Sequence, residues 1–393
     1  MYKLKNLLFI ISYNGYGGIE TVTNNLIEKL KKEYNIKIVY IDGENYRLKE
    51  NEYILKPNLE VKNFILRKIF LIMKVINLFY YKKKNNIDIV FCGGSFCNAF
   101  EGILQFFSKN ISITSIHSVQ SKEALGRKGF YPKLCHFSNK CLLNNFNEVI
   151  SISKGIKKDL LKTYPNLLLF KNKVIYNGFN FEEIMEKSKE KNEFEKDKYL
   201  IFVGRIVEEK QIEIIIKTFY FFHKENQEYK LLLVGSGNSE YEEKLKKIII
   251  KLEIVSSIVF LGKQDNPYKY MKKAKALLLT SKYEGLPSVV IEALILNVPV
   301  ISTNSSSGIW EILDSEYNLE VEELKKNKIF NNGIITPFIL ANMDLNLSRE
   351  EKYFFDALNS ISKIKNDFRR ENLKKFDINN IVEEYRRMIK NYE

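Results

Sequence analysis

The chain of 393 residues contains only four cysteines and three histidines. The cysteines form two pairs, Cys92 with Cys97 and Cys135 with Cys141, and neither spacing matches a usual structural zinc motif. Four cysteines are also too few for a disulfide framework in a chain of this length. We therefore expect reduced thiols in a cytoplasmic protein, and no metal site.

Long uninterrupted apolar runs are also missing. The run 7–11 is too short for the core of a signal peptide and indicates a buried first strand instead. The most apolar long stretch, 64–81, is interrupted by Arg67, Lys68 and Lys74. A membrane-spanning helix needs about 18 or more apolar residues. We expect a protein that does not cross a membrane and at most lies peripherally on the inner face of the cell membrane.

Positive charge is present in excess, with 62 Lys and Arg against 48 Asp and Glu and a formal net charge of +14. Such an excess favours an anionic partner, although lysines also fill solvated faces without any partner. Residues 61–86 hold seven basic residues and no acidic one, interleaved with apolar residues. We predict that this segment contacts an anionic membrane or a lipid-diphosphate acceptor. The alternative is that its apolar positions face the core and its lysines are merely solvated.

Short apolar runs alternate with helical segments, which indicates parallel βαβ units in a doubly wound α/β sheet. In the first half, strands are predicted at 7–12, 36–41, 87–92, 111–117 and 148–153. After a polar segment the alternation restarts, with strands predicted at 199–203, 230–234, 258–261, 276–280 and 299–302.

This restart predicts two Rossmann-like domains, with a linker near residues 177–198. We place the first domain at 1–178 and the second at 179–376. Residues 377–393 have helical periodicity, and we expect this C-terminal helix to pack back on the first domain.

Two cations follow the first strand of the second domain. Gly204 and Arg205 come directly after the strand, and Lys210 stands five residues later, near the start of a helix. Cations at this edge suit a diphosphate, which Arg binds through two hydrogen bonds and Lys as a point charge. Taken alone, the pair fits an ordinary exposed loop better. Gly235 and Lys263 follow the next two strands, where the backbone could approach a ligand, but plain turns have the same composition.

Two glutamates, Glu284 and Glu292, are separated by seven residues. Gly285 permits unusual backbone angles in the loop, and Pro287 suits the first turn of a helix. Glu292 lies about two turns into that helix on an otherwise apolar face, where a carboxylate must accept hydrogen bonds. A ribose diol has two such donors, sugar hydroxyls would serve Glu284, and amides of the first turn can bind phosphate. The alternative is a charge favoured by the helix dipole together with one interior salt bridge.

The segment SKYEGLPSVVIEAL resembles the glutamate-x7-glutamate motif of glycosyltransferase family 4, within the retaining GT-B superfamily. The segments VGRIVEEK, LLLVGSGNSEYEEKL, FLGKQDNPYKYMKKA and PVISTNSSSGIWEIL are similar to family segments in the same order. The resemblance is close over 199–337 and looser before it, and the polar stretches 315–328 and 340–347 depart from the family pattern. It implies a GT-B fold, in which two Rossmann-like domains face a central cleft. The first domain would serve the acceptor and the second the nucleotide sugar.

The resemblance also implies roles for single residues. Arg205 and Lys210 would hold the donor diphosphate, Glu292 the ribose and Glu284 the transferred sugar. His117 is similar to the family's histidine near the donor sugar, although a lone histidine at a strand end is more often structural. The predicted catalytic residues are Glu284, His117, Arg205 and Lys210. The predicted donor-binding residues are Gly17, Gly18, Gly204, Arg205, Lys210, Gly235, Lys263, Glu284, Gly285, Leu286, Pro287, Ser288 and Glu292.

These residues predict a retaining, metal-independent hexosyl- or N-acetylhexosaminyltransferase without a cofactor. By family custom the donor is expected to be a UDP-sugar, with GDP-mannose second. The expected acceptor is a glycan or a lipid-diphosphate-linked saccharide in bacterial-type surface polysaccharide or glycoconjugate synthesis.

Three alternatives remain open. A dinucleotide-dependent oxidoreductase would use Gly15, Gly17 and Asp42, but its fingerprint needs a glycine where Glu20 stands. A sugar-nucleotide epimerase of related fold would share the donor contacts and need no acceptor. A non-catalytic partner subunit, or a nucleic-acid binder, would use the basic surface, but no nucleic-acid motif is recognisable and we expect no nucleic-acid partner.

Overall fold

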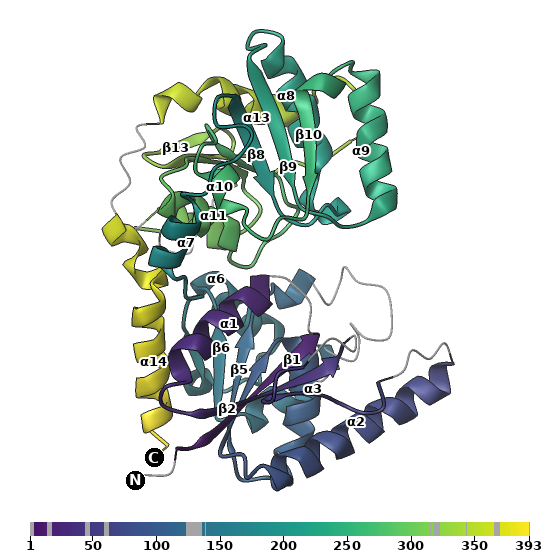
Figure 1. The fold of residues 1–393 in the computed structure, drawn as a ribbon, viewed down its shortest axis with the longest axis vertical. Coiled ribbons are helices and arrows are strands. Elements are labelled where there is room, and N and C mark those ends of the chain that lie inside the picture. The colour runs from purple at the N-terminus through teal and green to yellow at the C-terminus, as the bar shows by residue number, and fades with distance from the viewer. Residues whose placement is uncertain are drawn as a thin grey trace. The chain divides into compact units, whose positions relative to one another are not determined.

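The computed structural model describes the chain apart from residues 1–3, 14–17, 44–47, 59–62, 123–135, 138, 315, 318–322, 343, 365–369 and 393. The chain folds into two compact units (Figure 1). The first unit comprises Met1–Phe179 together with Phe376–Glu393, and the second comprises Asn180–Lys375.

The described part of the first unit contains a seven-stranded parallel sheet in the order β3-β2-β1-β4-β5-β6-β7. Its strands are β1 Asn6–Tyr13, β2 Asn35–Asp42, β3 Glu52–Ile54, β4 Ile89–Gly93, β5 Ile111–Ile116, β6 Glu148–Ser151 and β7 Asn172–Val174. Its helices are α1 Gly18–Leu30, α2 Phe64–Lys84, α3 Ser95–Leu104, α6 Lys154–Thr163 and α14 Ile378–Lys390, with 3-10 turns η1 Leu143–Asn145 and η2 Leu169–Lys171. The five strands predicted for this half are confirmed.

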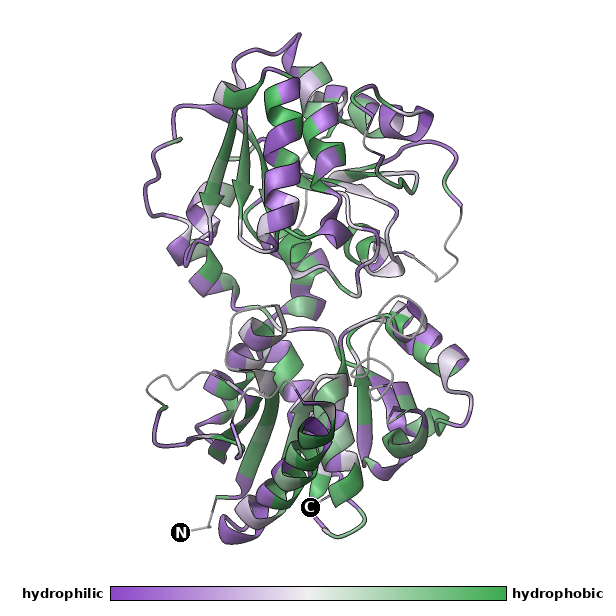
Figure 2. Ribbon diagram, turned by 90° about the vertical axis from the view of Figure 1, so that its right-hand side faces the viewer, coloured by the Kyte–Doolittle hydropathy of each residue, from purple (hydrophilic) through white to green (hydrophobic). Residues whose placement is uncertain are grey.

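The central strands β1 and β4 contain continuous apolar runs because helices cover both faces of a parallel sheet. In β1, the consecutive residues Leu7, Leu8, Phe9 and Ile10 are all buried. The edge strands β3 and β7 were not predicted, since three residues are too few to form a recognisable run. Figure 2 shows the apolar strands of both sheets between helices with mixed polar and apolar faces.

The C-terminal helix α14 packs on the first unit through an apolar face that includes Ile381 and Tyr385. The Tyr385 ring meets the Phe91 ring edge-on, with 5.7 Å between their centroids. The chain returns to this unit beside the point where it leaves, because the Phe179 amide donates to the Phe376 carbonyl at 2.8 Å. The periodicity of 377–392 therefore predicted the helix itself correctly.

The described part of the second unit also contains a seven-stranded sheet, in the order β10-β9-β8-β11-β12-β14-β13, parallel except for β13. Its strands are β8 Lys198–Val203, β9 Tyr229–Val234, β10 Ile258–Gly262, β11 Leu277–Leu279, β12 Val300–Thr303, β13 Lys328–Phe330 and β14 Gly333–Thr336. Its helices are α7 Phe181–Lys187, α8 Ile212–His223, α9 Ser239–Lys251, α10 Tyr268–Met271, α11 Ser288–Ile295, α12 Ser307–Leu313 and α13 Arg349–Asn359. Its 3-10 turns are η3 Glu208–Lys210, η4 Val255–Ser257, η5 Ile361–Lys363 and η6 Arg370–Phe376. The five predicted strands of this half are confirmed, whereas β13 and β14 were not predicted.

The predicted linker over 177–198 is wrong for most of its length. Helix α7 forms within it, begins after an Asn180 side-chain cap and packs against α10 and α11. Further along, the Asn192 side chain donates to the Lys269 carbonyl at 2.7 Å. The polar composition of this segment reflects a surface helix with an apolar contact side and not a free connection.

Strand order places the loops that matter for binding. In each sheet the order reverses at the first strand, so β1 lies between β2 and β4, and β8 lies between β9 and β11. Ligands of open α/β sheets bind outside the carboxyl ends of the strands at such a reversal. In the second unit these are the loops after β8 and β11, which carry the predicted diphosphate and sugar contacts.

Candidate functional site

The loop after β8 approaches the loop after β9 at backbone distance. The Gly204 amide donates to the Val234 carbonyl at 3.0 Å, and the Ile206 amide donates to the Ser236 carbonyl at 3.1 Å. A Cβ atom at Gly235, whose φ is +141°, would lie 1.8 Å from the Gly204 carbonyl oxygen. Gly235 is therefore required by backbone packing, and this packing positions the residues that follow Gly204.

The two cations of the β8 loop have different surroundings. Arg205 is exposed, and within the described residues no carboxylate pairs with its guanidinium group. The Lys210 side chain is 19% exposed, and its Nζ lies 2.5 Å from Oε1 of Glu284. The structure therefore brings Lys210 and Glu284 together, although 74 positions separate them in the sequence.

Gln211 ties the β8 loop to its neighbours and was missed by the sequence analysis. It is fully buried, and its backbone adopts the left-handed conformation with φ 49° and ψ 46°. Its Nε2 donates to the carbonyls of Thr280 and Ile339, both at 2.9 Å, and its Oε1 accepts from the Ala341 amide at 2.9 Å. The one signal in the sequence was a polar residue between Lys210 and the apolar helix α8. This signal does not identify the partners of Gln211, because they lie in distant segments.

The loop after β11 is held by side-chain contacts of its own. The Ser281 hydroxyl donates to Glu284 Oε1 at 2.7 Å, so this oxygen contacts both Ser281 and Lys210. A Cβ at Gly308, on α12, would lie 2.1 Å from the Gly285 carbonyl oxygen. Gly308 thus allows α12 to pack against the loop, a requirement that the sequence analysis did not assign.

Helix α11 begins directly after this loop. Pro287 is its N-cap residue with φ −70° and ψ 103°, and no side chain caps the helix. Leu286 and Pro287 are buried, whereas Ser288 is partly exposed. First-turn amides without a side-chain cap, at the positive end of the helix dipole, can donate to an anion.

Glu292 lies one turn further along α11 and is partly buried. Burial raises the pKa of Glu292 to about 7, and a hydrogen bond from the Tyr268 side chain opposes part of this shift. Tyr268 is the first residue of α10, and the sequence analysis missed it as a partner of Glu292. Lys263, the remaining predicted contact of this unit, is exposed after β10. Once ionised, the Glu292 carboxylate can therefore accept hydrogen bonds from the hydroxyl groups of a ligand.

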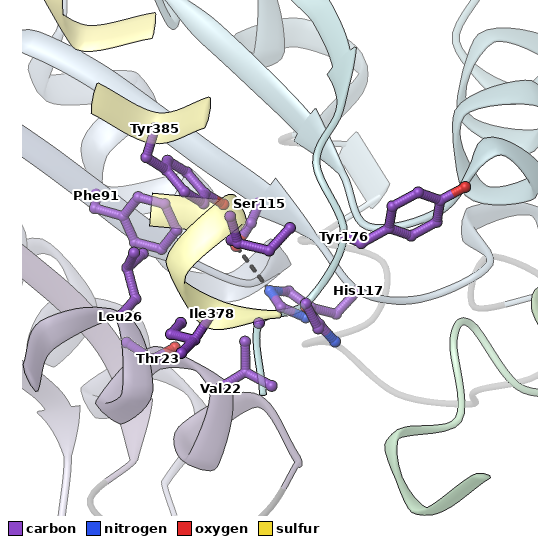
Figure 3. Close-up of a pocket in the computed structure, with 12 residues that line it drawn as sticks. Val22, Thr23, Leu26, Phe91, Ser115, His117, Tyr176, Ile378 and Tyr385 are labelled. Atoms are coloured by element: carbon purple, nitrogen blue, oxygen red, sulfur yellow. Dashed lines mark hydrogen bonds between the residues drawn. The ribbon is translucent and has the colours of Figure 1, made fainter. Parts of the chain in front are cut away.

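His117 belongs to the first unit and follows β5. Its Nε2 lies 2.7 Å from the Ser115 hydroxyl, and burial lowers its pKa to about 4 (Figure 3). It borders a hollow of about 20 Å³, which holds roughly one water molecule. Residues of α1, β4, β5 and α14 line the hollow, among them Thr23, Phe91 and Ile378.

Gly17 lies outside the described residues, and Gly18 is the first residue of α1. Their assignment to donor phosphates comes from the family resemblance and stays a prediction. Three of the four cysteines are described, and Cys92, Cys97 and Cys141 are free thiols. No cluster of three or more His, Cys, Asp or Glu side chains that could hold a metal ion occurs in the described ranges. None of the described helices is long and apolar enough to cross a membrane.

Known proteins with similar sequences are glycosyltransferases. Residues 183–336 match the family model described as Glycosyl transferases group 1, a range that contains Arg205, Lys210, Glu284 and Glu292. An uncharacterized glycosyltransferase of Methanocaldococcus jannaschii is 35% identical over 212 residues, and the match covers 51% of each chain. The chain thus spans about half the length of this relative.

A second relative is matched over more of its length. It is the N-acetylgalactosamine-N,N'-diacetylbacillosaminyl-diphospho-undecaprenol 4-alpha-N-acetylgalactosaminyltransferase of Campylobacter jejuni. It is 26% identical over 328 residues, which cover 82% of this chain and 87% of the relative.

Among solved structures, HepE of Anabaena in complex with UDP and glucose superimposes with a TM-score of 0.76 at 15% identity, covering 98% of this chain and 100% of HepE. At this identity the likeness establishes the fold alone, and that fold is the α/β GT-B fold predicted from the sequence. The oxidoreductase, epimerase and partner-subunit alternatives are not favoured by these relatives. The family match and the relatives thus show similarity to glycosyltransferases over part or most of the chain, and the fold is of the GT-B type.

Proposed function

We propose that this chain is a retaining, metal-independent glycosyltransferase that uses a UDP-sugar donor and a lipid-linked saccharide acceptor. One observation carries the proposal. At the reversal of strand order in the second unit, the β8 loop with Arg205 and Lys210 meets the β11 loop with Glu284 and the uncapped start of α11. This combination provides positive charge and amide donors for a diphosphate beside a carboxylate for sugar hydroxyls.

Charge develops on the leaving diphosphate when the bond to the anomeric carbon breaks. Arg205 and Lys210 would stabilise this charge, and the first amides of α11 would donate to the phosphate oxygens. Such cations perform the task that a metal ion performs in other transferases, which supports metal independence. Lys210 already has Glu284 as a counter-ion, so the donor would share its ammonium group with that carboxylate.

Retention of configuration is supported by the state of the two titratable groups that could otherwise serve as the base, Glu284 and His117. Glu284 accepts from Lys210 and Ser281, and we assign its carboxylate to sugar hydroxyls. His117 has its pKa lowered to about 4, which makes it a weak base at neutral pH. The departing phosphate oxygen then takes the proton of the acceptor hydroxyl as the new glycosidic bond forms. Because that oxygen lies on the face it leaves, the new bond keeps the configuration of the donor.

The choice of substrates is supported by the ligands of one similar structure and by the name of one relative. HepE was crystallised with UDP and glucose, and the name of the Campylobacter relative specifies a diphospho-undecaprenol-linked acceptor. We therefore propose that the donor is a UDP-sugar and that the transferred sugar is a hexose or an N-acetylhexosamine. The product would belong to surface polysaccharide or glycoconjugate synthesis. A lipid-linked acceptor would hold the enzyme at the cytoplasmic face of a membrane.

The test is to incubate the protein with a panel of UDP- and GDP-sugars and to follow nucleoside diphosphate release with and without an undecaprenyl-diphosphate saccharide. We expect release from one UDP-sugar to depend on the acceptor, and proton NMR of the product to give the coupling constant of an α-linkage from an α-donor. Conversion of the donor sugar without an acceptor would instead support the epimerase alternative. A β-linked product would contradict retention.

A further inference from the structure

Helix α2 presents its apolar side chains outward. Its large exposed side chains include Ile65 and Ile72, which are 68% and 61% exposed, and Tyr80, which is 64% exposed. Among the side chains of α2 whose burial is described, the exposed apolar set is Ile65, Leu66, Ile69, Ile72, Met73, Ile76 and Tyr80. At 3.6 residues per turn, these seven positions fall within about 120° of the helix circumference. They form one continuous face, which we call the outer face of α2.

The inner side of the same helix is held by polar contacts. Lys74 is buried, donates to the Ile41 carbonyl at 2.8 Å and pairs with Asp42. Lys82 is also buried and donates to both carboxylate oxygens of Glu101, at 2.7 and 2.8 Å. Rotating α2 to bury its outer face would take the only described cation away from the buried Glu101 carboxylate, which is unfavourable. The apolar face is therefore held outward by these contacts.

The sequence alternative that the apolar positions of 61–86 face the core is thus wrong for the outer face. Of the seven basic residues in 61–86, Lys74 and Lys82 are buried and thus not available to a surface partner, and Lys62 lies outside the described residues. The described cations that are exposed lie near the two ends of the helix, Arg67 and Lys68 within its first two turns and Lys83 and Lys84 in its last.

The charged side chains of α2 itself are all of one sign. Residues 63–87 contain no acidic residue. A second copy of the chain would bring cations against cations, because a two-fold contact between two α2 helices pairs the same surface with itself. An anionic lipid surface has the opposite charge, and an apolar face flanked by lysine and arginine is typical of helices that lie in a headgroup interface.

We propose that the outer face of α2 is a membrane-docking surface, which lies in the plane of an anionic lipid bilayer with the end cations on the headgroups. This deepens the proposed function, on which it rests for the location of the acceptor, because a lipid-linked saccharide is held in that bilayer. The docking itself needs neither donor nor acceptor.

The experiment is vesicle flotation of the full chain without substrates, using equal parts phosphatidylglycerol and phosphatidylcholine, or phosphatidylcholine alone. We expect at least about tenfold stronger binding to the anionic vesicles. Ile72→Gln with Ile76→Gln should weaken that binding at least about tenfold, because less apolar surface leaves water. Lys83→Glu with Lys84→Glu should lower it to the level of neutral vesicles.

The matched control is Ile250→Gln with Lys251→Glu on α9 of the second unit, where Ile250 is 63% exposed. This control should bind like the unsubstituted protein. Ile76→Trp should give fluorescence that shifts to shorter wavelength with anionic vesicles, since the native Trp310 is 3% exposed and contributes a constant signal.

Three results would overturn the proposal. They are no binding to anionic vesicles, undiminished binding of the Ile72→Gln, Ile76→Gln variant, and self-association of the free protein that this variant abolishes. Nucleotide release from the donor in detergent solution is measured on the same variants and should not change. A protein that docks but releases no nucleotide would refute the proposed function and leave the docking surface standing.

Discussion

Nζ of Lys210 lies 2.5 Å from Oε1 of Glu284, and both side chains are largely buried, at 19% and 14% exposed. The pair joins the loop after β8 to the loop after β11, at the reversal of strand order in the second unit. The two groups neutralise each other in the absence of a donor. A diphosphate bound at Lys210 would therefore change the charge balance at the carboxylate proposed to contact the sugar.

Removing either cation should slow sugar transfer. Arg205→Ala and Lys210→Ala should each lower kcat at least about a hundredfold, because each loses stabilisation of charge on the leaving group. Lys210→Ala should be the more severe, since it also leaves Glu284 without its counter-ion. Steady-state nucleotide release measures both, with Lys251→Ala on α9 as the control. Turnover close to that of the unsubstituted enzyme in both variants would refute the diphosphate assignment.

Glu284→Gln should separate catalysis from folding. The amide keeps the size of the side chain and its oxygen can still accept from Ser281 and Lys210, so folding should suffer less than catalysis even though Lys210 loses its counter-ion. Loss of the negative charge frees Lys210 for the diphosphate, so UDP affinity should be unchanged or higher. We expect kcat to fall at least about tenfold because the sugar hydroxyls lose their ionised acceptor. Calorimetric titration with UDP and turnover together test this, and a parallel loss of UDP binding would contradict it.

Glu292 should make donor binding depend on pH. Its pKa is raised to about 7, so below this value the carboxyl group is protonated and must lose a proton to accept two ribose hydroxyls. Affinity for a UDP-sugar should fall about tenfold for each unit of pH below 7. In Glu292→Gln the affinity should be low and independent of pH in this range. A UDP-sugar is the better probe, because UDP itself has a phosphate that titrates nearby.

The same shift predicts a stability effect of opposite sign. A carboxyl whose pKa is higher in the folded state than in the unfolded state destabilises the fold as pH rises from the unfolded value of 4.5 to about 7. Glu292→Gln should therefore raise the melting temperature of the ligand-free protein at pH 8, and the difference should vanish near pH 4.5. Melting curves of the two proteins across this range provide the check, and a variant less stable at pH 8 would argue for a structural role.

Gln211 should act by positioning Lys210 and the β11 loop. Gln211→Gly keeps the left-handed backbone but leaves three buried backbone groups without partners, at a cost of about 1 kcal/mol or more each. Gln211→Ala adds about 1 kcal/mol of backbone strain at φ 49°. We expect both variants to melt earlier, Ala before Gly, and kcat to fall more than the affinity for UDP. Unchanged kcat in a stably folded Gln211→Gly variant would show that the loop holds its position without this side chain.

A chelator should leave the activity intact, because Arg205 and Lys210 supply the positive charge at the diphosphate. Nucleotide release is measured before and after dialysis against EDTA, and again after addition of Mg²⁺ or Mn²⁺. Equal rates in all three conditions are expected. Loss of activity that either cation restores would contradict metal independence.

The sequence alone predicted most elements of the fold and the candidate site. Continuous apolar runs predicted ten of the strands, because a parallel strand buried on both faces needs no alternating pattern. The restart of that pattern indicated two Rossmann-like sheets, and the residues after the first strand of the second sheet were singled out on spacing and charge. Short strands such as β3, with three residues, have too little pattern to be recognised.

Only the tertiary structure decided which side chains meet. Gln211 contacts Ile339 across 128 positions, and no local periodicity encodes such a partner. The orientation of α2 was decided in the same way. The spacing of its apolar residues places them on one side of the helix, and in most amphipathic helices that side faces the core. The Lys82–Glu101 ion pair, in which both side chains are buried, and the buried Lys74, which donates to the Ile41 carbonyl, fix the opposite side of the helix, so the apolar side lies outward.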